Sequence, residues 1–329
     1  MAEKISFNEL LNFLILNKDQ KFLITFHSMG DRDSVGAAVA LQSYLSRSVI
    51  ATPDFITSTS KRLLASLHNA PQIITKIPKD VFGIIVLDAN TPVATGKFEK
   101  EIGKSKKPVV FIDHHESAKP DASKATMFID ERYNSTSSLI TNLLHSLGVK
   151  LGRDASLSLL NGIVADSAEF HNMHAETFKQ VAMLLENSGI SYSTFMMNFD
   201  ESPPPENRLS AISDLCSARK EAVGKYLIAY GETSLHANVA AETAINVGAD
   251  ASVFWAIGKK EVSISARIRP PLEKHLQIHL GRMMWEIGDI IGGNGGGHAA
   301  AAGAYGPKKE MSKKATDRLI SQVKQKLSE

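Results

Sequence analysis

Four short apolar runs in the first half of the chain each end at an acidic side chain or an imidazole. The runs cover residues 22–26, 83–87, 108–112 and 161–165. Runs of this length, bounded by turn residues, indicate buried strands or buried helix ends. Ligands gather where the strands of an open α/β sheet end. We therefore expect the side chains that follow these runs to converge on one crevice.

The alternation of segments predicts an α/β fold. Between residues 21 and 179, apolar runs alternate with helical segments at 34–45, 135–147 and 154–164. This pattern is typical of parallel βα units. Residues 1–198 are therefore expected to form a first domain around a parallel sheet.

Three consecutive prolines at residues 203–205 mark a change in the chain. Prolines favour an extended spacer over a continuing helix, which predicts a linker at 199–207. Residues 208–329 then form a second, smaller α/β domain, and we expect a bilobal molecule with the active site in the cleft. The segments expected in the second domain are strands at 226–230, 252–257 and 261–268, a hairpin turn at 258–260, a helix at 276–291 and a glycine-rich loop at 292–297.

Charge and cysteine content exclude several classes of protein. The formal net charge is +2 and there is no extended track of lysine or arginine, so tight tracking along a long polyanion is not expected. The single cysteine cannot form an internal disulfide, which is typical of a reducing compartment. No apolar stretch reaches the ~18 residues that span a bilayer, and the N-terminus lacks the layout of a signal peptide. We expect a cytoplasmic protein without a membrane partner.

The polar residues after the apolar runs have the side chains of a metal centre. Asp31 and Asp33, two residues apart on a turn that leaves a strand, can reach two adjacent sites. Any one of these residues alone is more simply a helix cap or a hydrogen-bonded interior group. Several carboxylates at buried strand ends, however, repel one another unless cations compensate. The candidate set is His27, Asp31, Asp33, Asp88, Asp113, His114, His115 and Asp166.

The donor atoms of this set restrict the choice of metal. Imidazole nitrogens and carboxylate oxygens, without a thiolate, suit Mn²⁺, Mg²⁺, Zn²⁺ or Fe²⁺. We expect a pair of divalent ions, with Mn²⁺ as the first choice and Mg²⁺ as the alternative.

A glycine run in the second domain has the composition of an anion-binding loop. Gly295, Gly296 and Gly297 precede His298. Successive backbone N–H groups without side chains can form an anion-binding nest, and His298 would add a directional donor. The alternative is a flexible loop that follows a helix.

An arginine-bearing segment lies before the glycine run. Residues 263–269 alternate in polarity, so Arg267 and Arg269 share one face of the expected strand. A guanidinium there can present two parallel donors to a phosphate. For Arg269, a solvated charge beside Pro270 is an equally simple interpretation.

Taken in order, these residues resemble the motifs of a known family, the DHH phosphoesterases. The resemblance covers nearly the whole chain and comes nearest to the compact RecJ-like and nanoRNase-like members. The first-domain motifs that carry it are His27-x-x-x-Asp31-x-Asp33, Asp88, Asp113-His114-His115 and Asp166. The signature of the C-terminal DHH-associated domain is matched by Gly295-Gly296-Gly297-His298 and Ala301-Ala302-Gly303.

The chain departs from the family pattern at two places. Gly30 stands where many relatives have proline, which changes the stiffness of the loop and removes no ligand. The stretch at 169–172, Glu-Phe-His-Asn, follows Asp166 at a place where relatives vary with their substrate. The second departure leaves the choice of substrate open.

The resemblance implies a role for each matched residue. It implies that His27, Asp31 and Asp88 hold one ion, and that Asp33, Asp88, His114 and Asp166 hold the other. Asp88 would bridge the two ions. Asp113 would orient a ligand imidazole, and His115 would contact the phosphate or the leaving oxygen. In the second domain, the family has a serine-x-arginine element that binds substrate. Arg267 matches this element better than Arg269 does.

The expected activity is therefore hydrolysis of a phosphodiester with a divalent metal pair. The substrate expected first is a short single-stranded oligonucleotide, degraded to nucleoside 5′-monophosphates. A cyclic dinucleotide such as cyclic di-AMP is the next candidate, followed by single-stranded DNA in repair, and a pyrophosphatase is less favoured. A catalytically silent replication or binding scaffold is the non-enzyme alternative, against which the complete ligand set argues. The sequence is also compatible with a homodimer.

Overall fold

The computed structural model describes residues 3–115, 125–167, 170, 173–199, 204–234 and 236–329. The chain divides into two compact units, Met1–Asp200 and Glu201–Glu329, and each is described by itself. The unit boundary falls inside the stretch that was expected to be a spacer. Helix α9 begins in the same stretch, at Pro205, because a proline at the first helical position loses no hydrogen bond.

The first unit is built on a parallel sheet of seven strands in the order β1-β7-β6-β5-β2-β3-β4. All residues of β2, β5 and β6 are buried, as is usual for a parallel sheet that is covered on both faces. The strands are β1 Glu3–Lys4, β2 Phe22–Phe26, β3 Val49–Ala51, β4 Ile73–Ile74, β5 Gly83–Leu87, β6 Val109–Asp113 and β7 Thr126–Ile129.

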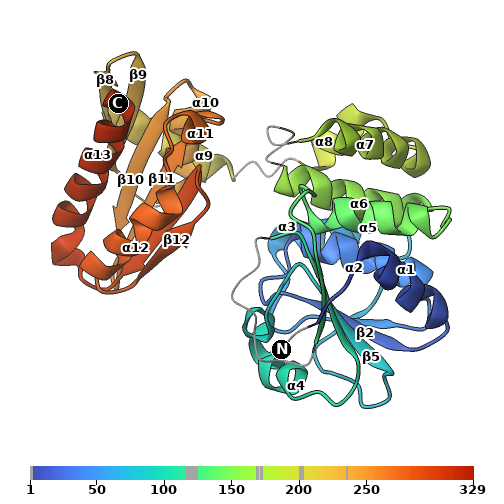
Figure 1. Ribbon diagram of the computed structural model, residues 1–329. Coiled ribbons are helices and arrows are strands. Elements are labelled where there is room, and N and C mark those ends of the chain that lie inside the picture. The colour runs from blue at the N-terminus through green and yellow to red at the C-terminus, as the bar shows by residue number, and fades with distance from the viewer. Residues whose placement is uncertain (1–2, 116–124, 168–169, 171–172, 200–203, 235) are drawn as a thin grey trace. The chain divides into compact units, whose positions relative to one another are not determined.

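Helices cover both faces of this sheet. Figure 1 shows α1, α2, α5 and α6 over one face, with α7 and α8 stacked outside α6, and α4 below the other face. The helices are α1 Phe7–Leu16, α2 Arg32–Tyr44, α3 Ser58–Ser66, α4 Glu99–Gly103, α5 Thr136–Ser146, α6 Arg153–Asp166, α7 Ala175–Ser188 and α8 Tyr192–Phe199, with a 3₁₀ helix at Pro92–Phe98. This arrangement confirms the predicted parallel-sheet first domain.

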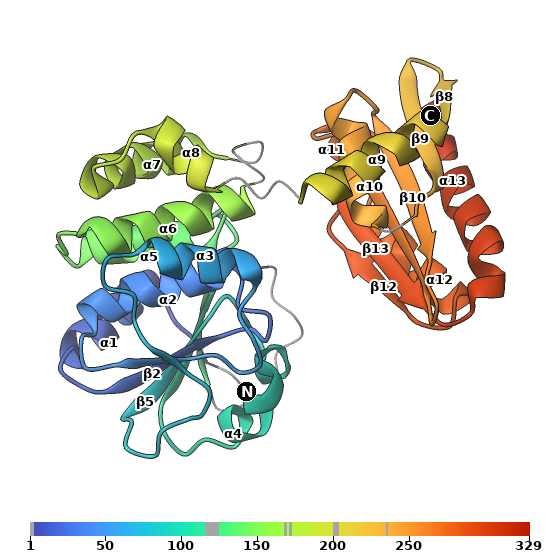
Figure 2. The same cartoon turned by 180° about the vertical axis from the view of Figure 1, so that it is seen from behind.

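The second unit is smaller and has a mixed sheet in the order β12-β13-β11-β10-β9-β8, in which only β9 and β10 pair in parallel. Figure 2, viewed from behind, shows α9 and α10 on the face of the sheet opposite α12 and α13. The strands are β8 Arg219–Val223, β9 Tyr226–Glu232, β10 Ala251–Ile257, β11 Val262–Ile268, β12 Asn294–Gly297 and β13 Ala301–Gly306. The helices are α9 Pro205–Ser217, α10 Ala237–Asn246, α11 Leu272–His275, α12 Leu280–Ile290 and α13 Ser312–Ser328, with a 3₁₀ helix at Lys309–Met311.

Two expectations for the second unit were wrong. The helix expected at 276–291 begins at Leu280, because the ring of His279 accepts a hydrogen bond from Arg282 N and caps the helix there. The glycine run is an edge strand, β12, and not a loop, because it pairs with β13. Within the described ranges, no helix is long and apolar enough to cross a membrane.

Glycines let three helices of the first unit approach one another closely. A Cβ added to Gly36 of α2 would lie 2.3 Å from the carbonyl oxygen of Ser158 on α6. A Cβ added to Gly162 of α6 would lie 2.0 Å from Ser137 Oγ on α5. Neither distance leaves room for a methyl group, so the packing of α2, α5 and α6 depends on these glycines. The same packing brings the N-termini of α2 and α5 to the C-terminal half of α6.

We expect Gly36→Ala to lower the free energy of unfolding by about 1–3 kcal/mol, the usual cost of overpacking a tight contact. The backbone carbonyl of Ser158 cannot move aside as a flexible side chain would. Gly103→Ala is the matched control, since its added Cβ would lie 3.7 Å from Pro92 Cβ, an ordinary contact. Urea unfolding of both variants beside the wild-type protein checks this, and equal stability of the two variants would contradict it.

Candidate metal centre

The candidate ligands gather at the carboxyl edge of the parallel sheet. Strands β6, β5 and β2 are neighbours and point the same way, so the residues that follow them meet at one edge. His27 follows β2, Asp88 follows β5, and His114 follows β6. Two helices add the rest, because Asp31 caps the N-terminus of α2 and Asp166 ends α6.

The first group of ligands is His27, Asp31 and Asp88. His27 Nε2 lies 3.3 Å from Asp31 Oδ1 and 3.4 Å from Asp88 Oδ2. Its other ring nitrogen, Nδ1, accepts a hydrogen bond of 3.2 Å from Met29 N, which turns Nε2 toward the carboxylates. Burial by itself lowers the pKa of His27, but the hydrogen bonds with Asp31 and Asp88 outweigh it and raise the pKa to about 10.

The loop that carries this group has an unusual backbone at Gly30. Its φ is +49°, and its N–H donates to the carbonyl oxygen of His27 at 3.2 Å. Proline has φ fixed near −65° and no N–H, so proline could not adopt this conformation. The departure at Gly30 therefore changes the path of the loop, and not its stiffness alone, while both neighbouring ligands stay in place.

The second group is Asp33, His114 and Asp166. His114 Nε2 lies 3.0 Å from Asp166 Oδ2, 3.6 Å from Asp88 Oδ1 and 4.0 Å from Asp33 Oδ2. The ring is held from behind, since Nδ1 is 3.3 Å from the carbonyl oxygen of Tyr133 and must donate to it. That tautomer leaves Nε2 with a lone pair that faces carboxylates. Such a contact is repulsive unless a proton or a metal ion lies between the two groups.

Asp88 belongs to the surroundings of both groups. Its Oδ2 faces His27 and its Oδ1 faces His114. Its backbone is also unusual, with φ of +57°, in the left-handed region. Aspartate and asparagine are among the few residues with a Cβ that visit this region readily.

Burial and mutual repulsion make the carboxylates costly to ionise. Burial raises the pKa of Asp33 well above its usual value, and repulsion from Asp88 and Asp166 adds to the shift. Burial also raises the pKa of Asp88, although its hydrogen bond with His27 offsets part of this. A positive ion between these groups would reverse both shifts.

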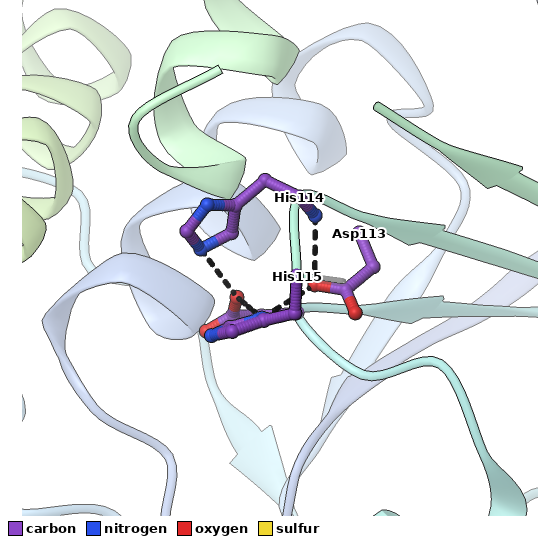
Figure 3. A group of neighbouring side chains, drawn as sticks. Asp113, His114 and His115 are labelled. Atoms are coloured by element: carbon purple, nitrogen blue, oxygen red, sulfur yellow. Dashed lines mark hydrogen bonds and ion pairs between the residues drawn. The ribbon is translucent and has the colours of Figure 1, made fainter. Parts of the chain in front are cut away.

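Asp113 connects its two histidine neighbours, as Figure 3 shows. Its Oδ1 accepts hydrogen bonds of 2.8 Å from the backbone N–H of His114 and from Nδ1 of His115. The imidazole that Asp113 holds is thus that of His115, whereas the ring of the candidate ligand His114 is held by Tyr133. The bond with Asp113 raises the pKa of His115, whose side chain is 49% exposed.

The residues present fit a divalent cation. Within the described part of the chain, Asp113 Oδ2 and His114 Nε2 are buried and make no hydrogen bond, although His114 Nε2 lies 3.0 Å from Asp166 Oδ2. Three sets of ligand atoms each lie within 4.8 Å of one another: Asp88 with Asp113, His114 and His115; His27 with Asp31 and Asp88; and Asp33 with His114 and Asp166. Nitrogen and oxygen donors in this proportion suit a hard or borderline divalent ion.

Thr136 and Ser137 lie at the site and were not among the predicted site residues. Asp33 accepts backbone hydrogen bonds from Thr136 N at 2.6 Å and Ser137 N at 2.7 Å, and Thr136 Oγ1 donates to Asp88. Ser135 has the pattern of a helix N-cap, which could have located the start of α5. Nothing in the local pattern relates that helix start to carboxylates about 50 and 100 residues earlier.

In the second unit, most of the predicted substrate residues line one pocket. The pocket has a volume of about 590 Å³ and is lined by Arg267, Gly296, Gly297 and His298, among others. Arg267 Nη1 donates to Ser265 Oγ and to the carbonyl oxygen of Ala266, each at 3.1 Å. These bonds hold the guanidinium against its own strand.

Gly295 is placed differently, because it packs against α12 and is not among the residues that line the pocket. A Cβ at Gly295 would lie 1.8 Å from the carbonyl oxygen of Met284 on α12, and a Cβ on Gly281 of α12 would lie 1.9 Å from that of Gly297. The glycines thus allow α12 to pack directly on an extended strand.

The second departure from the family pattern lies mostly outside the described residues. Of the stretch 169–172, the structure describes Phe170 alone, which has φ of +76°. Its ring stacks on that of Phe178 at a centroid distance of 5.8 Å.

Comparison with solved structures shows the same fold in other proteins. An exopolyphosphatase-related protein from Bacteroides fragilis aligns with a TM-score of 0.77 and 17% identity over 98% of each chain. A putative family II inorganic pyrophosphatase from Methanococcus jannaschii aligns with a TM-score of 0.50 and 16% identity, over 91% of this chain and 99% of that one. At these identities the similarity concerns the fold alone.

Comparison of sequences supports the same relationship. An uncharacterized protein of Methanocaldococcus jannaschii is 28% identical over 326 residues, which are 96% of this chain and 94% of the relative. The model of the DHH family N-terminal domain matches residues 21–165, and that of the DHHA1 domain matches residues 224–329. With the metal-ligand motifs gathered at one sheet edge and both domain models matched in order, the chain belongs to the DHH family.

Proposed function

We propose that this protein is a divalent-metal-dependent phosphodiesterase that hydrolyses short single-stranded oligonucleotides to nucleoside 5′-monophosphates. The observation that carries the proposal is that the Asp88 carboxylate lies between two neighbouring ligand groups: it belongs to the first group, and its Oδ1 lies 3.6 Å from His114 Nε2 of the second. Two such groups suit a pair of ions, for which Mn²⁺ is our first choice and Mg²⁺ the alternative. When bound, a metal pair supplies Lewis acidity and a water of lowered pKa for attack on phosphorus.

The side chains of the first unit have distinct tasks in this proposal. His27 and Asp31 hold one ion, Asp33, His114 and Asp166 hold the other, and Asp88 serves both. His115 is half exposed beside them, and its bond to Asp113 favours the protonated ring. A protonated imidazole at that place can contact the phosphate or donate a proton to the leaving oxygen.

Exposed apolar side chains near the first ligand group favour an organic substrate over an inorganic one. Met29 is 56% exposed and Phe55 is 54% exposed. Their loops are joined, since Phe55 N donates to the carbonyl oxygen of Ser28 at 3.4 Å. Aromatic side chains at such places stack on nucleic-acid bases. Pyrophosphate and polyphosphate have no base and would gain nothing from them.

Arg267 supports a phosphate-bearing substrate from the second unit. It lines the same pocket as His298, and no acidic side chain is among the residues that line that pocket. Arg269 is different, because its guanidinium forms an ion pair with Asp250 beside another pocket. This difference supports Arg267 as the phosphate ligand and supplies a matched control for it.

We expect Asp88→Asn to abolish turnover and to lower metal occupancy in both groups, because the shared carboxylate loses its charge. His27→Ala should empty mainly the group to which His27 belongs. Metal analysis of the purified variants, beside activity on a dinucleotide, checks this. Retention of two ions by Asp88→Asn with near-normal activity would refute the shared role.

Replacing Arg267 by alanine should reduce kcat/KM by roughly 10²- to 10³-fold, the scale of losing one preorganised charge-stabilising donor. The metal content should stay unchanged, because the candidate ligand groups found among the described residues all lie in the first unit. Arg269→Ala is the control and should keep near-normal kcat/KM. If the two arginine variants behave alike, Arg267 has no special part in phosphate recognition.

Turnover should be best on oligomers of about two to five nucleotides and decline on longer strands, since a chain of net charge +2 neutralises few phosphates. The slope of log K against log salt should be shallow, about −1 to −3. The test is a Mn²⁺-supplemented digest of RNA dinucleotides, longer oligomers, cyclic di-AMP, 3′-phosphoadenosine 5′-phosphate and pyrophosphate. Preferred cleavage of strands beyond twenty nucleotides with a steep salt slope, or of pyrophosphate alone, would overturn the proposed substrate.

A further inference from the structure

The N-terminus of α5 points at the candidate metal ligands. Ser135 caps the helix by accepting a 2.9 Å hydrogen bond from Ser138 N, which leaves the N–H groups of Thr136 and Ser137 for another acceptor. Both donate to Asp33, one to each carboxylate oxygen, at 2.6 and 2.7 Å. The positive end of the helix dipole thus lies against a buried carboxylate.

Thr136 makes a second contact with the site, through its side chain. Its hydroxyl donates to Asp88 Oδ1 at 2.9 Å, and the residue is completely buried. One residue therefore holds carboxylates from two separate segments, Asp33 through its N–H and Asp88 through its hydroxyl. Because Thr136 is completely buried, water cannot readily take the place of its hydroxyl.

The contact fixes how the Asp88 carboxylate is rotated. Oδ1, which Thr136 holds, lies 3.6 Å from His114 Nε2, whereas Oδ2 lies 3.4 Å from His27 Nε2. Each oxygen therefore faces one ligand group. Rotation of the carboxylate would turn an oxygen away from its group and toward the other. A donor on Oδ1 resists that rotation.

We propose that Thr136 is a positioning residue that holds the Asp88 carboxylate so that each of its oxygens serves one metal ion. The inference rests on the metal pair of the proposed function and deepens it, because it names the residue that orients the carboxylate between the two ligand groups. Partners of this kind, which hold a ligand without touching the metal, typically change metal affinity or activity by about 10- to 100-fold when removed.

The matched control lies one turn along the same helix. Thr141 is completely buried like Thr136, but its hydroxyl donates at 2.7 Å to the carbonyl oxygen of Ser137 within the helix. Thr141→Val therefore removes a buried hydroxyl from α5 without touching a carboxylate of the site. Thr136→Val makes the same chemical change where the hydroxyl meets Asp88, and Thr136→Ser keeps the hydroxyl.

The test is calorimetric titration of Mn²⁺ into the metal-free full-length protein and its variants. The wild-type protein, Thr136→Ser and Thr141→Val should bind two ions with similar affinity. Thr136→Val should lose roughly 10- to 100-fold in affinity, mainly for the second ion. With Mn²⁺ high enough to fill both groups, its kcat on a dinucleotide should stay reduced while KM changes little, because Arg267 is untouched.

Each outcome supports or refutes a definite statement. Failure of the wild-type protein to bind two ions would refute the proposed function itself. Wild-type affinity in Thr136→Val, or an equal loss in Thr136→Ser or Thr141→Val, would refute the positioning role while leaving the metal pair intact. A thermal unfolding measurement accompanies every titration. If the valine variant does not fold, Thr136→Ala replaces it, because alanine removes the hydroxyl without adding a methyl group.

Discussion

Repulsion among buried carboxylates is the constraint on which the rest of the first unit depends. Asp33 and Asp88 are buried side by side, and water cannot screen their charges. The fold opposes this repulsion with the N-terminus of α5 and with the rings of His27 and His114 when these are protonated, as their raised pKa values favour. The close packing of α2, α5 and α6 through Gly36 and Gly162 keeps the N-terminus of α5 against these carboxylates. The stability of this unit and its capacity for metal are therefore linked.

The sequence was sufficient to predict the parallel sheet and the residues at its carboxyl edge. Apolar runs are local signals, and the strands they predict at Phe22–Phe26 and Gly83–Leu87 have the predicted bounds. Parallel strands must end at the same edge, so the residues after them had to meet. The hairpin of β10 and β11 could be predicted in the same way, because its two strands are close together in the sequence.

Features that depend on contacts between distant segments could not be predicted in the same way. The glycine run has the composition of a loop, and only its pairing with β13 shows that it is a strand. The start of α12 depends on a ring nitrogen of His279, which propensity does not describe. The hold of Thr136 on Asp33 and Asp88 is a tertiary contact that no pattern around residue 136 specifies. The pairing of Asp113 with His115 instead of His114 is a matter of side-chain rotation, which the order of residues leaves open.

The left-handed backbone at Asp88 restricts how this site can change by mutation. A residue with φ of +57° is strained for most side chains, and asparagine is one of the few others that adopt it readily. Glutamate would keep the charge but lose the favoured backbone, while alanine would lose both. Asparagine would preserve the path of the chain while it removes the charge. If the proposed function holds, a single conservative substitution at this turn would therefore remove the carboxylate between the two ligand groups and leave the architecture of the domain in place.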